Sequence, residues 1–215
     1  MCSFGRKKID IFLIVQASTF MMIPASIDIE NEGSLRKYRL SKKLMTSMDT
    51  VNFHVLRGGV SNKTVLVDIS GTSFVMKQGL SKLRVPGDWF SNPARIQREA
   101  AGMKALKKIL PDHQITRLVF VDNEECILVM DAVPQPHENL KTILLKGGNH
   151  DDLIQKMAVM LATIHKSTWH NKEFEMEFGN TEFFHELRID PYFRHCVQQY
   201  PEIAPWFERN IFSNL

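Results

Sequence analysis

Phe74-Val75-Met76-Lys77-Gln78 is a short apolar run of strand-forming residues with one lysine inside it. A charged side chain in a buried strand is costly unless an anionic group meets it, because an unpaired charge in a low-dielectric interior loses its hydration. The Lys77 ammonium therefore needs a counter-charge from elsewhere in the chain or from a ligand. The two candidates are a carboxylate from a helix and the phosphates of a bound nucleotide.

A helical segment downstream carries a carboxylate on its apolar side. The pair Asn92-Pro93 predicts the helix start, because asparagine caps helices and proline fits their first turn. Pro111 predicts its end, since proline cannot continue a helix. Helical spacing places Glu99 on the same face as four apolar residues: Ile96, Met103, Leu106 and Leu110.

The partner of Glu99 has two interpretations. In the first, its carboxylate meets the Lys77 ammonium, so that the strand lysine and the helix glutamate compensate each other. In the second, Glu99 turns to the edge of its helix and pairs with Arg95 or Lys104 nearby. The sequence alone leaves both interpretations open.

Five segments have the apolar pattern of strands. They are rich in aliphatic residues, have turn signals between them, and span residues 51–57, 63–69, 72–78, 115–121 and 126–133. Ser70-Gly71 separates the second and third segments as a tight hairpin turn. The helix falls between the third and fourth segments. This order predicts an α+β fold with a five-stranded antiparallel sheet and one inserted helix.

A glycine-containing segment joins the first two strands. Gly58-Gly59-Val60-Ser61-Asn62 allows a sharp turn and a close backbone approach to a ligand, and Ser61 and Asn62 add hydrogen-bonding side chains. These properties suit a phosphate-binding loop. A plain hairpin turn is the ordinary explanation of two adjacent glycines, so the motif alone decides nothing.

Pro134-Gln135-Pro136 predicts a boundary, because two prolines end the sheet and extend the chain. Helical patterns follow at 139–146 and from residue 151 or 152 onward, and the aromatic-rich residues 169–200 are interpreted as helices and loops that cover a core. The second helical pattern has apolar residues at core-like spacing: Leu153, Met157, Met160, Leu161 and Ile164.

Three regions result from these boundaries. Residues 49–133 form the predicted sheet-containing lobe, residues 134–215 form a helical lobe, and residues 1–48 form an N-terminal extension and basic linker. The polar residues 31–49 are interpreted as a surface helix or linker whose charges face solvent.

The start of the chain has the outline of a signal peptide, with Arg6, Lys7 and Lys8 before a mostly apolar stretch at 9–23. That stretch is shorter than the roughly 18 residues of a membrane span and contains Asp10, which favours a plain extension over a signal or anchor.

The charge and cysteine content of the chain limit the classes of binding partner that we expect. The net charge is only +3, and basic residues are interleaved with acidic ones, which argues against a nucleic-acid-binding surface. Cys2, Cys126 and Cys196 lie far apart without metal-ligand spacing and predict free thiols in a reducing compartment. We therefore expect a cytoplasmic protein with neither nucleic acid nor membrane as its partner.

The order of these elements resembles the small-molecule kinases of the aminoglycoside phosphotransferase and methylthioribose kinase type, which share the two-lobed protein-kinase-like fold. The resemblance covers about residues 52–200. It rests on Leu-Arg-Gly-Gly-Val-Ser-Asn at 56–62, Phe-Val-Met-Lys-Gln at 74–78, Arg-Ile-Gln-Arg-Glu-Ala at 95–100, Leu-Val-Met-Asp-Ala-Val-Pro at 128–134, and Phe-Phe-His-Glu-Leu-Arg-Ile-Asp-Pro-Tyr at 183–192.

This resemblance implies an ATP-dependent phosphotransferase that acts on a small-molecule alcohol, with ATP as its cofactor. On the phosphate side, Lys77 would contact the α- and β-phosphates and pair with Glu99. The covering loop would contain Gly58, Gly59, Ser61 and Asn62. On the adenine side, Met130 would line the back of the pocket, and the backbone of Asp131 and Val133 would hydrogen-bond the base.

The catalytic part of the family pattern has no counterpart here. These kinases use a His-x-Asp loop, an asparagine five residues after its aspartate, and a second aspartate that holds Mg²⁺. The one His-x-Asp, His150-Asp151-Asp152, has methionine at 157 and caps a helix. No catalytic or metal-binding residue is assigned, and Mg²⁺ is expected only in a complete family member.

The resemblance therefore predicts a truncated form whose helical lobe is incomplete and whose catalytic loop lies beyond residue 215. We expect such a chain to be inactive alone, and an incomplete lobe to expose apolar surface. The acceptor substrate is left open. The alternative is a non-catalytic nucleotide-binding or regulatory module.

Overall fold

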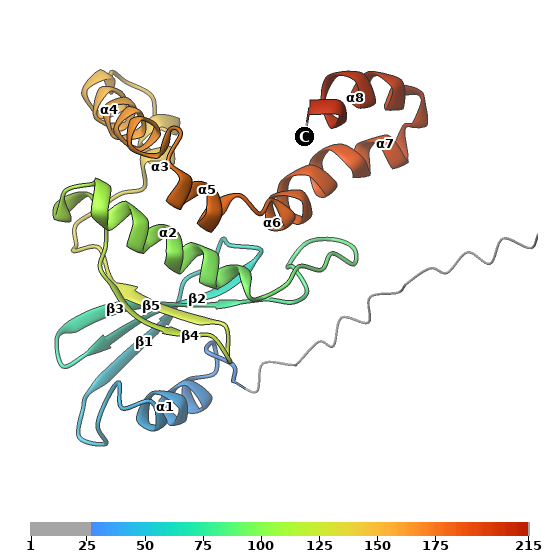
Figure 1. The fold of residues 1–215 in the computed structure, drawn as a ribbon. Helices are drawn as coiled ribbons and strands as arrows, with labels where there is room; N and C mark the ends of the chain where they lie inside the picture. The colour runs from blue at the N-terminus through green and yellow to red at the C-terminus, as the bar shows by residue number, and fades with distance from the viewer. Residues whose placement is uncertain (1–26, 215) are drawn as a thin grey trace, which may run out of the picture.

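A five-stranded antiparallel sheet organises the computed structural model, which describes residues 27–214 (Figure 1). Its strands lie in the order β1-β2-β3-β5-β4. They are β1 (Val51–Val55), β2 (Asn62–Ile69), β3 (Thr72–Gly79), β4 (Leu118–Asp122) and β5 (Ile127–Asp131). Helix α2 (Arg95–Ile109) connects β3 to β4. The predicted α+β fold, with an antiparallel sheet and one inserted helix, is confirmed.

The hairpin between β2 and β3 has the predicted turn. Ser70 and Gly71 both have positive φ, 50° and 85°, and Ile69 lies opposite Thr72. Two consecutive residues with positive φ suit a two-residue hairpin, because the turn then matches the right-handed twist of the strands. Strand β3 pairs with β2 on one side and with β5 on the other, and is therefore the central strand of the sheet.

Alternating side chains give the sheet two different faces. One face carries the larger core, in which the buried strand residues are Val65, Val67, Met76, Ile127 and Val129. Leu128 lies on the opposite face, packed beneath α2 with Ile96 and Ala100. Figure 1 shows α1 on one side of the sheet and α2 on the other.

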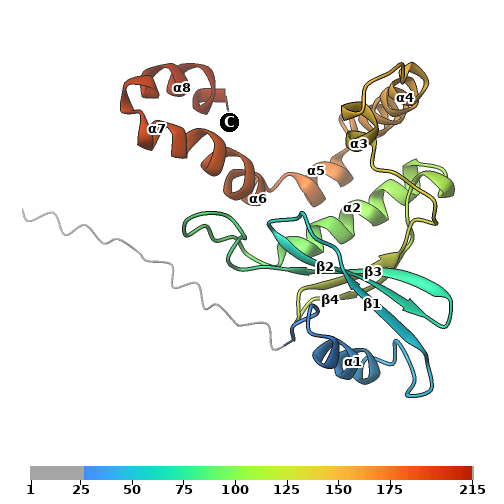
Figure 2. The same cartoon turned by 180° about the vertical axis from the view of Figure 1, so that it is seen from behind.

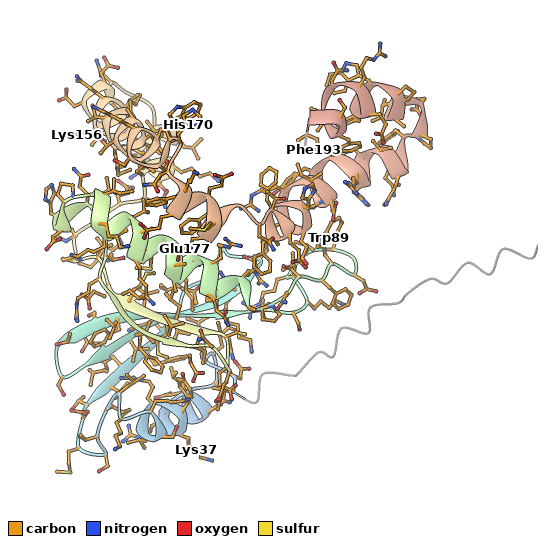
Figure 3. All side chains as sticks on the ribbon, viewed as in Figure 1. Lys37, Trp89, Lys156, His170, Glu177 and Phe193 are labelled. Atoms are coloured by element: carbon orange, nitrogen blue, oxygen red, sulfur yellow. The ribbon has the colours of Figure 1, made fainter. Side chains whose placement is uncertain are left out.

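Helix α1 (Glu32–Ser41) corrects the prediction that residues 31–49 are a solvated helix or linker. Leu35, Tyr38 and Arg39 are buried, because their spacing places them together on the side that faces the sheet. The charges at Arg36 and Lys37 are exposed, and Figure 3 shows Lys37 pointing away from the sheet. Apart from the buried Arg39, the basic residues of this helix therefore lie on its solvent-facing side.

Helix α2 begins two residues later than Asn92-Pro93 predicts. The Asn92 side chain accepts a hydrogen bond from the Ala94 amide at 2.9 Å, and the Arg95 amide bonds to the Asn92 carbonyl at 3.1 Å. These bonds form the turn that leads into the helix, so the predicted start signal acts slightly upstream of the first regular turn.

The residues after the connector are helical. Short 3₁₀ turns occur at Pro201–Ile203 and Phe212–Asn214, and a π-helix spans His185–Arg194. A further 3₁₀ turn, Asp112–Gln114, lies before the connector, between α2 and β4. The α-helices are α3 (Leu140–Leu145), α4 (Asp151–Thr168), α5 (Lys172–Phe178), α6 (Glu182–Phe184), α7 (His195–Gln199) and α8 (Ala204–Asn210). Figure 2 shows α3 and α4 near one end of α2 and α6 near its other end, with α7 and α8 extending away from the sheet.

Helix α4 corrects the prediction of a core at its apolar residues. Leu153, Met157 and Leu161 are exposed, and no residue of this helix is buried. Periodic apolar spacing predicts the helix itself, but burial also needs a neighbouring surface, and residues 27–214 place little against this side of α4. The expected exposure of apolar helix surface is confirmed.

The fold does not test two of the sequence predictions, namely the role of the apolar N-terminal stretch and the division of the chain into three regions. The apolar stretch at 9–23 lies outside the described residues. Within residues 27–214, no helix is both long enough and apolar enough to cross a membrane. The division at residues 48 and 133 stays a prediction.

Asp122 ties α1 to the sheet. The Tyr38 hydroxyl donates to its carboxylate at 2.9 Å, Lys42 Nζ lies 2.7 Å away, and the amides of Glu124 and Glu125 also donate to it. Burial alone would raise the pKa of Asp122, but these hydrogen bonds outweigh it and hold the pKa below its usual range.

Asp122→Asn should lower the free energy of unfolding at pH 7 by about 1–3 kcal/mol. Because the folded pKa lies below the unfolded one, the carboxylate stabilises the fold above about pH 4 and loses this effect as the pH falls through the folded value. Urea unfolding from pH 7 to pH 3 should therefore show wild type and variant converging in acid. A difference that stays constant over this range would contradict the assignment.

Candidate functional site

Lys77 on β3 and Glu99 on α2 form an ion pair. Lys77 Nζ lies 2.5 Å from Glu99 Oε1, which is the first of the two interpretations drawn from the sequence. Lys77 lies between Thr64 on β2 and Leu128 on β5, so its side chain leaves the sheet on the side of α2. The alternative pairing of Glu99 with Arg95 or Lys104 is wrong.

The pair is less buried than the sequence suggests. The side chains of Lys77 and Glu99 are 25% and 35% exposed. An ion pair at this exposure contributes about 1 kcal/mol or less to stability, because solvent screens it. The Lys77 ammonium is therefore positioned by Glu99 and still accessible to an anionic ligand.

Arg95, at the start of α2, is a site residue that the sequence did not reveal. Its guanidinium donates to the Leu80 carbonyl at 2.9 Å, to the Asn92 carbonyl at 3.0 Å, and to the Ser61 carbonyl. The residue is only 7% exposed, and burial lowers its pKa. It fixes the end of the glycine-containing loop to the end of β3 and to the beginning of α2.

Backbone contacts also hold the loop between β1 and β2. The Leu80 amide donates to the Ser61 carbonyl at 3.0 Å, and the Arg84 amide donates to the Val60 carbonyl at 2.9 Å. Gly58 has φ of 112°, a conformation that side-chain-bearing residues rarely adopt. The segment is therefore an anchored loop that packs on residues 80–84, rather than a simple two-residue hairpin.

Gly79 sets the distance between β3 and the approach to α2. A Cβ atom at this position would lie 2.5 Å from the Pro93 carbonyl oxygen. The two backbone segments can approach this closely because glycine has no side chain. This contact, together with the Arg95 hydrogen bonds, places α2 over one end of the sheet.

An apolar concavity of about 520 Å³ lies on the half of the sheet that α2 leaves uncovered. Val75, two residues before Lys77, lines it and has the same orientation as the lysine. Leu66 lies opposite Val75 on β2, and the connector closes one side. The other lining residues are Leu56, Gly71, Thr72, Ser73, Ala132, Val133, Pro134, Gln135 and His137.

The three residues predicted for the adenine side lie in different surroundings. Val133 lines the concavity. Met130 is the cross-strand neighbour of Val75 and packs against the cluster under α2. The Asp131 side chain pairs with Arg117 at 2.9 Å, and its amide already donates to the Arg117 carbonyl at 3.0 Å. Their role in binding stays a prediction.

A glutamate from the helical region fastens the loop that precedes α2. Glu186 accepts hydrogen bonds from the Ser91 hydroxyl at 2.7 Å and from the Asn92 amide at 3.3 Å. The Trp89 indole donates to the Glu186 carbonyl at 3.3 Å, and Figure 3 shows Trp89 on this loop beside the C-terminal helices. No local pattern indicates Glu186 as a site residue, because its partners lie more than 90 residues earlier in the chain.

Metal ligands do not gather near this site. Within the part of the chain that the structure describes, no three residues of the types His, Cys, Asp and Glu are grouped so that they could hold a metal ion. The residues present therefore do not fit a protein-held Mg²⁺ site, and no chemical step is assigned to such an ion.

Known proteins add no assignment to this geometry, since no family model and no curated protein matches the chain.

Arg95→Met should destabilise the fold by about 2–4 kcal/mol, because it removes three hydrogen bonds from a buried guanidinium to backbone carbonyls, of which only those of Ser61 and Asn92 keep a backbone amide donor. Chemical denaturation measures this change. Lys104→Met, which removes an exposed cation from the same helix, is the matched control and should change stability by less than about 0.5 kcal/mol. Similar effects from both substitutions would show that Arg95 contributes only charge.

Proposed function

We propose that this chain binds ATP on the uncovered half of its sheet, as the nucleotide-binding lobe of a small-molecule phosphotransferase with a protein-kinase-like fold. The observation that carries the proposal is the partly exposed Lys77–Glu99 pair, with Lys77 two residues along β3 from Val75, which lines an apolar concavity on the same face of the sheet. The anchored loop that contains two glycines leads into β2, the neighbouring strand. A cation, an apolar surface and a glycine-containing loop whose backbone can approach the ligand closely are three features that suit a nucleotide.

The adenine ring would occupy the concavity. Leu66 and Val75 supply an apolar floor for the base, and the connector at Val133 supplies backbone polar groups for its edge. A pocket that is mostly apolar with a few convergent polar groups is the usual form of a small-molecule site. In this placement the ribose and phosphates lead from the concavity towards Lys77.

The phosphates would meet the Lys77 ammonium. Glu99 holds this ammonium on the α2 side of the sheet, where it can stabilise phosphate charge without first being ordered by the ligand. Ser61 and Asn62 lie at the start of β2, and Arg95 fixes the Ser61 carbonyl. The backbone at 58–62 is thereby placed to cover the phosphates while Gly58 and Gly59 remain unobstructed.

Support for the phosphotransferase family comes from the order of the elements. Three strands, a helix, two strands and a proline-containing connector precede a helical region, as in the kinase family that the sequence resembles. The described residues offer no metal-ligand group, so we assign them nucleotide binding and not phosphoryl transfer. The alternative function is a non-catalytic nucleotide-binding or regulatory module, with the same site.

ATP should raise the melting temperature of the full chain, because a ligand that binds only the folded state stabilises it.

Lys77→Met should weaken ATP binding about tenfold, as measured by calorimetry with and without Mg²⁺, since it removes the cation that meets the phosphates. Lys104→Met, an exposed lysine on α2, is the control and should bind as wild type does. The absence of any shift with millimolar ATP, or equal binding by Lys77→Met, would refute the proposal.

A phosphotransfer assay distinguishes nucleotide binding alone from phosphoryl transfer by this chain. ATP-dependent phosphorylation of a small alcohol by the purified chain would contradict the assignment of binding alone. Binding without turnover would support it.

Val75→Phe should place a ring in the concavity and weaken ATP binding at least tenfold while the fold is kept. The control is Val55→Phe, which adds the same ring to an exposed position on the opposite face of the sheet. Calorimetric titration of both variants tests where the base binds. Unchanged affinity in Val75→Phe would place the base elsewhere.

A further inference from the structure

The loop between β3 and α2 is held from the helical region. The Glu186 carboxylate accepts hydrogen bonds from the Ser91 hydroxyl and the Asn92 amide, and its backbone carbonyl accepts one from the Trp89 indole. The Trp89 ring also meets the His195 ring edge-on, with 5.8 Å between the ring centroids. The π-helix and α7 therefore both contact the end of this loop that leads into α2.

This loop folds back on itself as two arms. The Ser91 amide donates to the Ser81 carbonyl at 3.0 Å, and the Leu83 amide donates to the Trp89 carbonyl at 2.8 Å. An antiparallel bridge lies between these two hydrogen bonds. Because the arms are paired, a contact that fixes the second arm also restrains the first.

The first arm pairs in turn with the glycine-containing loop. The Leu80 amide donates to the Ser61 carbonyl at 3.0 Å, and the Arg84 amide donates to the Val60 carbonyl at 2.9 Å. Figure 1 shows the loop between β3 and α2 lying next to α6. Hydrogen bonds therefore connect Glu186, through the two arms, to the backbone that would cover the phosphates.

Glu186 also acts on the buried Arg95 through its charge. Burial lowers the pKa of Arg95, and the negative charge of Glu186 is the largest of those that oppose this change. The Arg95 guanidinium donates to the Ser61 carbonyl and to the Leu80 carbonyl. A buried cation needs such compensation, so Glu186 supports the anchor of Ser61 by a second route.

We propose that Glu186 is a positioning residue of the nucleotide site, which holds the glycine-containing loop over the phosphates through the loop before α2 and through Arg95. This inference rests on the proposed function. It makes phosphate binding depend on the helical region, although the residues proposed to contact ATP all lie before residue 134. Adenine would bind in the concavity, so Glu186 should matter for the phosphates and not for the base.

The first test needs no nucleotide. Hydrogen–deuterium exchange of the full chain reports on the Leu80 and Arg84 amides, whose hydrogen bonds hold the glycine-containing loop. In Glu186→Ala both amides should exchange about tenfold faster, because their bonds have lost support from the helical region, while the amides of β3 stay as in wild type. Glu182→Ala is the matched control, since it removes an exposed carboxylate from α6, and it should exchange as wild type does.

Unchanged exchange at Leu80 and Arg84 in Glu186→Ala overturns the proposal. An equal acceleration along β3 also overturns it, because the effect would then be a general loss of stability.

The second test is calorimetric titration with ATP and with adenosine. Glu186→Ala should weaken ATP binding about tenfold and adenosine binding by less than about twofold. Glu186→Gln keeps an acceptor oxygen for Ser91 and Asn92 but no charge, so it should weaken ATP binding about threefold, and it decides if Glu186→Ala does not fold. Equal losses for ATP and adenosine overturn the proposal.

This proposal and the proposed function fail in different ways. A wild-type chain that binds no ATP refutes the proposed function and, with it, the role of Glu186 in phosphate binding. ATP binding by wild type that stays unchanged in both Glu186 variants refutes the positioning role alone.

Discussion

A charged residue on the central strand must meet a counter-charge, and this requirement determines how α2 lies on the sheet. Lys77 reaches Glu99 across the space between β3 and α2 at 2.5 Å. The pair is too exposed to be a main source of stability, so its importance is geometric. With α2 held over Leu128 and Met130, the β1–β3 half of the same face stays open, and Val75 lies in the concavity that results. The ion pair, together with the close approach at Gly79 and the Arg95 hydrogen bonds, thus accounts for both the covered and the uncovered part of the face.

Features that depend on neighbours in sequence could be predicted. The strand pattern, the Ser70-Gly71 turn and the helix between Asn92 and Pro111 all have local signatures, and the structure has each of them within a few residues. The burial of α1 could not be predicted from its charge, because Leu35, Tyr38 and Arg39 are a minority in a basic stretch. The spacing of the apolar residues of α4 could not show that they are exposed, since an apolar helix face is buried only where another surface meets it.

The candidate site likewise contains some residues that the sequence predicts and others that it does not. Lys77 and Glu99 could be paired from the sequence because each is a charge in an apolar pattern, and two such anomalies of opposite sign suggest each other. Arg95 could not be found, because its partners are backbone carbonyls, which are present at every position and carry no sequence signal. Hydrogen bonds of this kind fix loops without leaving a motif.

The hydrogen bonds of Glu186 to Ser91 and Asn92 can form only late in the synthesis of the chain. Every strand pairing lies within residues 51–131, so the pairing partners of the whole sheet are present once residue 131 has been synthesised. Glu186 is 95 residues beyond its partner Ser91. In a growing chain the hydrogen bonds of Glu186 to the loop before α2 can therefore form only after the seconds needed to add the intervening residues, later than the pairing of the strands.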